Sequence, residues 1–172
     1  TLVIFTTDNG TAGASYLTVD ENGKMVRTKV VSIRNGEVVP GGKGKFDDTG
    51  TRVPLIANWP GQIEPGQEVN DMVDLTDYLP TLEAIAGKSS DDLELDGVSF
   101  APLLLGESRE SRRDWIYIEL KGKRCIRSPW WKLYDDGRFY DLKNDPAEKS
   151  PLKADKLSKA AAKERVKLQR EL

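Results

Sequence analysis

The chain opens with a short apolar run, residues 2–5, which leads into Asp8, Asn9 and a turn at Gly10. An apolar run without alternation is typical of a strand that is buried on both faces, as in parallel sheets. Residues 53–59 form a second run of this kind. The two runs predict an α/β protein with a mainly parallel sheet and flanking helices.

Alternating segments and turn residues between the two runs predict antiparallel hairpins. The predicted strands span residues 15–19, 25–33 and 37–39. Asn-Gly pairs at 22–23 and 35–36 predict the turns that join them, because this dipeptide favours tight hairpin turns. Residues 40–45 are too rich in glycine for a regular element, so they are predicted to form a loop.

The clearest helix is predicted within residues 71–87, where apolar residues recur at steps of three and four. These residues are Met72, Leu75, Leu79, Leu82 and Ile85. Pro80 disfavours a helix interior, so the regular part is predicted to begin near Asp77, with Pro80 in its first turn. Gly87 is placed to end the helix in the left-handed conformation.

The last third of the chain predicts a small antiparallel sheet and a helix. Four short strands are predicted at residues 115–120, 124–126, 131–134 and 138–142, and a helix at 154–172. The resulting division places residues 1–98 in the α/β part, 99–152 in a small antiparallel subdomain, and 153–172 in a C-terminal helix. Residues 89–94 form a polar, acidic connector.

The amino-acid composition excludes several kinds of catalytic chemistry but says little about the fold. The chain has 172 residues, with 38% hydrophobic and 31% charged residues and a net charge of −2, so nothing indicates a nucleic-acid partner. No apolar stretch reaches membrane-spanning length. The absence of histidine excludes Ser-His-Asp and Cys-His catalysis within this chain. A single cysteine, Cys125, excludes an internal disulfide.

Asp8 and Asn9 are candidate metal ligands because ligands gather at the carboxyl ends of parallel strands. Two adjacent oxygen donors are typical of half of a hard-cation site. A strand that ends in an Asn-Gly turn explains the same residues, and this segment alone favours the turn.

Six short signatures follow one another along the chain. They comprise Thr7-Asp8-Asn9-Gly10, then Gly42-Lys43-Gly44, then Arg52-Val53-Pro54 with Trp59-Pro60-Gly61, then Leu79-Pro80-Thr81-Leu82 with Ala86-Gly87, then Leu95-Asp96-Gly97-Val98-Ser99, and last Trp131-Lys132-Leu133 with Tyr140-Asp141-Leu142, Asp145-Pro146 and Glu148. In this order, over residues 1–152, they closely resemble the carboxyl-terminal half of the sulfatase family, which belongs to the alkaline-phosphatase-like superfamily.

The resemblance implies a sulfuric ester hydrolase with a formylglycine nucleophile and a divalent cation, usually calcium, with magnesium as the alternative. It makes Asp8 and Asn9 metal ligands. It makes Lys43 the catalytic and substrate-binding lysine that reaches the sulfate and leaving-group oxygens, where a cation offsets the charge that develops as the S–O bond breaks. The nine-residue step to Arg52 selects Lys43 over the nearby Lys45.

The chain departs from the family pattern at two places. The familiar Glu-Gly-Gly-x-Arg is replaced by residues 48–52, Asp-Thr-Gly-Thr-Arg, and Asp48 and Arg52 are given a structural role by default. The nucleophile motif, Cys/Ser-x-Pro-x-Arg, is missing, because Arg127 and Pro129 follow Cys125 in the wrong order. Cys125 is therefore predicted to be a packed strand residue.

We therefore expect the chain to be the carboxyl-terminal part of a sulfatase and to be inactive by itself. The resemblance implies a sulfated small molecule or glycan as substrate and a periplasmic or secreted location, and it leaves the oligomeric state open. One alternative is a phosphomonoesterase or phosphodiesterase of the same superfamily, although such sites commonly use histidine ligands. The other is a non-catalytic carbohydrate-binding or interaction module. Its candidate face comprises Trp130, Trp131, Tyr134, Phe139 and Tyr140, whose alternation is more typical of a core.

Overall fold

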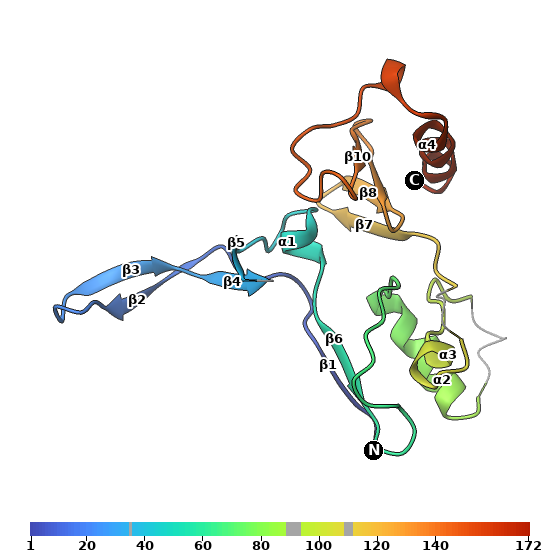
Figure 1. Ribbon diagram of the computed structural model, residues 1–172, viewed down its shortest axis with the longest axis horizontal. Coiled ribbons are helices and arrows are strands. Elements are labelled where there is room, and N and C mark those ends of the chain that lie inside the picture. Colours follow the sequence, from blue (N-terminus) through green and yellow to red (C-terminus); the bar gives the residue numbers. More distant parts are fainter. Residues whose placement is uncertain (35, 89–93, 109–111) are drawn as a thin grey trace.

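The computed structural model describes residues 1–34, 36–88, 94–108 and 112–172. Its N-terminal part contains three two-stranded sheets, and its C-terminal part contains a four-stranded sheet covered by the last helix (Figure 1). Within these ranges no helix is long and apolar enough to cross a membrane. The mixed α/β class is confirmed.

The two apolar runs form one antiparallel ladder. β1 (Val3–Thr6) pairs with β6 (Leu55–Asn58), with Val3 opposite Asn58 and Thr6 opposite Leu55. The prediction of a mainly parallel sheet is wrong for this part of the structure, because every strand pair in the described ranges is antiparallel. An apolar run indicates that a strand has apolar neighbours, but it carries no information on the direction of the adjacent strand.

The hairpins between β1 and β6 form an extended arm (Figure 1). It consists of the pair β2 (Ser15–Val19) and β3 (Met25–Lys29), followed by the pair β4 (Val31–Arg34) and β5 (Glu37–Pro40). The single strand predicted at 25–33 is divided at Val30, whose N–H donates to the Ala14 carbonyl at 2.9 Å. Asn35, in the second predicted turn, lies outside the described residues.

The predicted helix is confirmed from Tyr78 onward. A short 3-10 turn, η1 (Leu75–Asp77), leads directly into α2 (Tyr78–Ile85), which places Pro80 in the first turn. Gly87 follows the helix with φ of +67°, as its position predicts. A single-turn helix, α3 (Ala101–Leu104), was not predicted, since one turn is too short to show a period. Most of the acidic connector, residues 89–93, lies outside the described residues.

The predicted C-terminal antiparallel sheet is confirmed. β7 (Ile116–Leu120), β8 (Lys123–Arg127), β9 (Trp131–Tyr134) and β10 (Phe139–Asp141) lie side by side in the order β10-β9-β8-β7. After a 3-10 turn, η2 (Ala154–Lys156), helix α4 (Lys159–Glu171) packs on this sheet. The core between them consists of Ile126, Leu133, Phe139, Ala161 and Leu168.

A second buried cluster lies among Cys125, Tyr134, Tyr140 and Leu142, and Phe46 packs against it. The Phe46 and Tyr134 rings meet edge to face, with their centroids 6.1 Å apart. Tyr134, Phe139 and Tyr140 are thus core residues, as their alternation indicates. Phe46 is three residues from Lys43, so the sheet contacts the segment that carries the candidate catalytic lysine.

Cys125 is fully buried, which confirms its prediction as a packed residue. Burial raises the pKa of its thiol to about 11.

We therefore expect iodoacetamide to alkylate Cys125 at pH 8 only after unfolding. Because the folded state keeps this proton when the unfolded thiol has lost it, the free energy of unfolding should fall as the pH rises from about 9 to about 11. Urea unfolding at pH 8 and pH 10.5 tests this, and a Cys125→Ala variant should show a smaller loss. Alkylation of the folded protein at the rate of the unfolded protein would contradict the prediction.

Candidate functional site

Close backbone contacts place the segments that carry the candidate site residues next to each other. The Gly10 N–H donates to the Gly50 carbonyl at 2.9 Å. The Thr11 carbonyl accepts hydrogen bonds from Gly42 N at 2.9 Å and from Lys43 N at 3.0 Å. A Cβ at Gly10 would lie 1.9 Å from the Thr49 carbonyl oxygen, so no larger residue fits there. The turn after β1 and the loop that carries Lys43 are therefore packed directly against each other.

The side chains of Asp8 and Asn9 contact each other in the turn after β1. Asp8 is exposed and Asn9 is half-buried. The Asn9 side-chain nitrogen donates to Asp8 Oδ2, so the amide oxygen of Asn9 is directed away from that carboxylate oxygen. Carboxylate and amide oxygens suit a hard cation such as Ca²⁺, which takes six or more ligands. The described ranges contain no group of three or more His, Cys, Asp or Glu side chains that could hold a metal.

Lys43 is exposed between two glycines. Gly42 is buried against Thr49, and Gly44 has φ of +85°, in the left-handed region that favours glycine. The Lys45 N–H donates to the Gly42 carbonyl at 2.8 Å, which closes a tight turn around Lys43. The ammonium group of Lys43 therefore extends from a compact, defined turn.

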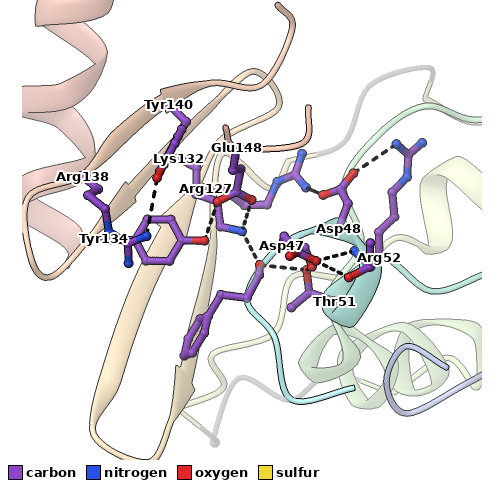
Figure 2. Close-up of polar contacts among 12 residues, drawn as sticks. Asp47, Asp48, Thr51, Arg52, Arg127, Lys132, Tyr134, Arg138, Tyr140 and Glu148 are labelled. Atoms are coloured by element: carbon purple, nitrogen blue, oxygen red, sulfur yellow. Dashed lines mark hydrogen bonds and ion pairs between the residues drawn. The ribbon is translucent and has the colours of Figure 1, made fainter. Parts of the chain in front are cut away.

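The helix α1 (Asp48–Thr51) follows this turn and was not predicted as a helix. Asp47 caps it, accepting a hydrogen bond from Thr49 N at 2.9 Å. Asp48 accepts a hydrogen bond from Arg127 Nη1 at 2.9 Å and lies 3.5 Å from Arg52 Nη1 (Figure 2). The contact with Arg127 fastens α1 to the four-stranded sheet. Asp48 thus holds α1 in place, in agreement with its expected structural role.

Lys132 is a buried residue whose role the sequence patterns do not reveal. Its side chain is fully buried, and Nζ lies 2.8 Å from Glu148 Oε1 while also donating to the Phe46 carbonyl (Figure 2). The Tyr134 hydroxyl donates to the other Glu148 oxygen, and burial together with this carboxylate raises the pKa of Tyr134. The sequence feature that could have identified this pair is a lysine inside an apolar strand. A charged residue that is buried there requires a partner.

A second buried ion pair, Asp77 with Arg113, lies elsewhere in the structure. Arg113 Nε donates to both carboxylate oxygens of Asp77, at 3.0 and 2.8 Å. The same oxygens accept from Val98 N and from Asp74 N, each at 2.7 Å. This pair joins the start of α2 to residues 95–100, so the signature around Gly97 has a structural explanation.

These features describe a small mixed α/β unit in which a four-stranded antiparallel sheet supports a glycine-rich lysine loop. Residues 43–172 match the family model described as N-sulphoglucosamine sulphohydrolase, C-terminal. The chain therefore belongs to the sulfatase family and corresponds to its C-terminal region.

Two relatives illustrate the match. Arylsulfatase A of Homo sapiens is 33% identical over 155 residues, which cover 86% of this chain and 28% of that protein. The ulvan-active sulfatase of Formosa agariphila is 44% identical over 108 residues, which cover 60% of this chain and 21% of that protein. The chain thus spans about a quarter of the length of these curated relatives.

Solved structures share the fold. A protein described in connection with the metabolism of multiple glycosaminoglycans by Bacteroides thetaiotaomicron superposes with a TM-score of 0.69 at 22% identity, covering 99% of this chain and 38% of that one. A second protein, solved in complex with its substrate D-glucosamine-2-N,6-O-disulfate, superposes with a TM-score of 0.63 at 22% identity, covering 99% and 33%.

Proposed function

We propose that this chain supplies Asp8, Asn9 and Lys43 to the active site of an enzyme that hydrolyses sulfate esters. The observation that supports the proposal most directly is the pair of hydrogen bonds from Gly42 N and Lys43 N to the Thr11 carbonyl. Those bonds hold the lysine loop beside the turn that carries Asp8 and Asn9. Membership of the sulfatase family supports the reaction class.

The proposed roles follow from the chemistry of the side chains. The oxygens of Asp8 and Asn9 would hold a divalent cation, with calcium favoured and magnesium as the alternative. When bound, the cation supplies positive charge next to the sulfate group. Lys43 binds a sulfate oxygen and offsets the negative charge that develops on the leaving-group oxygen. The nucleophile in this proposal is a formylglycine outside the chain described here, and residues 1–98 form part of the catalytic domain.

A sulfated small molecule or glycan is the proposed substrate. The solved relative that holds D-glucosamine-2-N,6-O-disulfate supports a sulfated sugar. A phosphate ester is the competing substrate class, and parallel assays with an aryl sulfate and an aryl phosphate distinguish the two. Faster turnover of the phosphate would overturn the proposal.

Calcium dependence tests the proposed ligands in the protein encoded by the complete gene. Replacing Asp8 with asparagine removes one negative charge from the ligand set, so we expect the calcium concentration for half-maximal aryl sulfate hydrolysis to rise by about tenfold or more. Calcium titration after treatment with a chelator measures it. Asp155→Asn changes another exposed aspartate, in η2, and should leave the titration unchanged. Identical titrations for Asp8→Asn and wild type would contradict the role of Asp8.

A further inference from the structure

The four-stranded sheet holds the segment after Lys43 through two cationic side chains (Figure 2). Lys132, on β9, donates from Nζ to the Phe46 carbonyl. Arg127, on β8, donates to Asp48 Oδ1 at 2.9 Å. The two contacts lie three and five residues beyond Lys43, so the sheet holds the lysine loop from its C-terminal side.

The Lys132–Glu148 pair is buried at an energetic cost. The exposed fractions of the two side chains are 0% and 6%. A buried ion pair is often no more stable than apolar side chains of the same size, so burial of this pair does not by itself favour folding. Glu148 also has φ of +53°, a left-handed backbone that is unfavourable for a residue with a Cβ. Both features indicate that the pair holds a particular arrangement of its neighbours.

A direct path of contacts connects Lys132 to the turn around Lys43. Lys132 fixes the Phe46 carbonyl, and the adjacent residue, Lys45, donates its N–H to Gly42 at 2.8 Å. On the other side, a Cβ at Gly50 would lie 2.2 Å from the Lys45 carbonyl oxygen. The loop is thus packed against α1 and anchored to the sheet, which leaves its position dependent on both contacts.

We infer that Lys132, paired with Glu148, is a positioning residue that sets the location of the Lys43 ammonium group. The inference rests on the proposed role of Lys43. Lys132 does not touch the substrate in this arrangement. It acts through the Phe46 carbonyl and the turn that Gly42 and Lys45 close.

A double variant, Lys132→Met with Glu148→Gln, tests the inference in the protein encoded by the complete gene. It removes both charges together, so no unpaired buried ion remains to unfold the protein. Misplacement of a catalytic group is expected to lower kcat for an aryl sulfate by about 10- to 100-fold. The loss in kcat should exceed the rise in KM, because Lys43 binds the sulfate in the ground state and stabilises the leaving-group oxygen more strongly in the transition state.

The matched control neutralises the other buried pair with Asp77→Asn and Arg113→Met. That pair binds the main chain of residues 96 and 98, away from the contacts between the four-stranded sheet and the lysine loop. We expect it to lower stability while the folded enzyme keeps the wild-type kcat. If kcat of this control falls as much as kcat of the Lys132 and Glu148 variant, both losses result from a general loss of stability. That result would overturn the inference.

A double-mutant cycle with Lys43→Ala separates positioning from an independent effect. If Lys132 acts through Lys43, adding the Lys132 and Glu148 changes to Lys43→Ala should lower kcat by less than about twofold further. A further loss equal to the loss in the wild-type background would overturn the inference.

Hydrogen exchange at the Lys45 amide gives a readout that does not depend on activity. We expect the Lys132 and Glu148 variant to increase this exchange rate, because the Lys45–Gly42 hydrogen bond loses its support, and unchanged exchange would overturn the inference. If Lys43→Ala keeps full activity while exchange increases, the proposed function fails, although the pair still orders the loop.

Discussion

Replacing Lys43 with alanine is expected to lower kcat for aryl sulfate hydrolysis by about 100- to 1,000-fold. The Lys43 side chain extends from a turn that Gly42, Gly44 and Lys45 define, so its main chain is fixed before the substrate binds. The positive charge of Lys43 stabilises the leaving-group oxygen most strongly in the transition state, when the S–O bond is breaking. Steady-state kinetics of the protein encoded by the complete gene measure the effect.

Lys45→Ala is the matched control for this prediction. Lys45 is two residues away and also exposed, and its contribution to the turn comes from its main-chain N–H, which alanine keeps. We expect its kcat to stay within about twofold of wild type. If the two variants lose activity equally, or if Lys45→Ala loses more, the assignment of Lys43 is wrong.

Local signals in the sequence predicted the local parts of the fold. The Asn-Gly pair after Asp20 predicted the first hairpin, and Gly23 there has φ of +77°. Apolar spacing together with Pro80 and Gly87 predicted α2. Each of these features depends on backbone preferences within a few residues, which a single sequence expresses directly.

The direction of strand pairing is not local, and that prediction failed. Residues 2–5 and 53–59 are apolar, but β1 and β6 pair antiparallel. Val3, Phe5 and Ile56 are 57–60% exposed within the described ranges. Apolar side chains indicate that a face of the strand is buried against another element. They do not indicate which element that is, or in which direction the neighbouring strand runs.

For the candidate site too, the sequence predicted the local features but not the contacts between distant residues. The order of the motifs predicted Asp8, Asn9 and Lys43 as candidates, and their roles remain predictions. The partners of Lys132 and Asp77 could not be predicted, because Glu148 and Arg113 lie 16 and 36 residues away. A charged residue in a buried segment indicates that a partner exists, but only the tertiary fold identifies that partner.

Replacing Asp77 with asparagine is expected to lower the free energy of unfolding by about 3–5 kcal/mol. Asp77 is 1% exposed, and the substitution removes the charged carboxylate that contacts the buried Arg113 guanidinium. Asparagine also places an NH₂ group where a carboxylate oxygen accepts from main-chain N–H groups of Val98 or Asp74. Urea unfolding of the protein encoded by the complete gene measures the change.

The control for Asp77 is Asp136→Asn, because the chain provides nearly the same contact at its surface. Arg138 Nε donates to Asp136 Oδ2 at 2.8 Å, the same distance as Arg113 Nε to Asp77 Oδ2. The Asp136 side chain is 51% exposed, so water replaces the lost contact, and the expected cost is about 0.2–1 kcal/mol. Asp136 also accepts a hydrogen bond from the Arg138 main-chain N–H, at 3.1 Å. A difference in cost therefore reflects mainly the burial of Asp77. Equal costs for the two variants would show that the buried carboxylate does not hold residues 95–100 against α2.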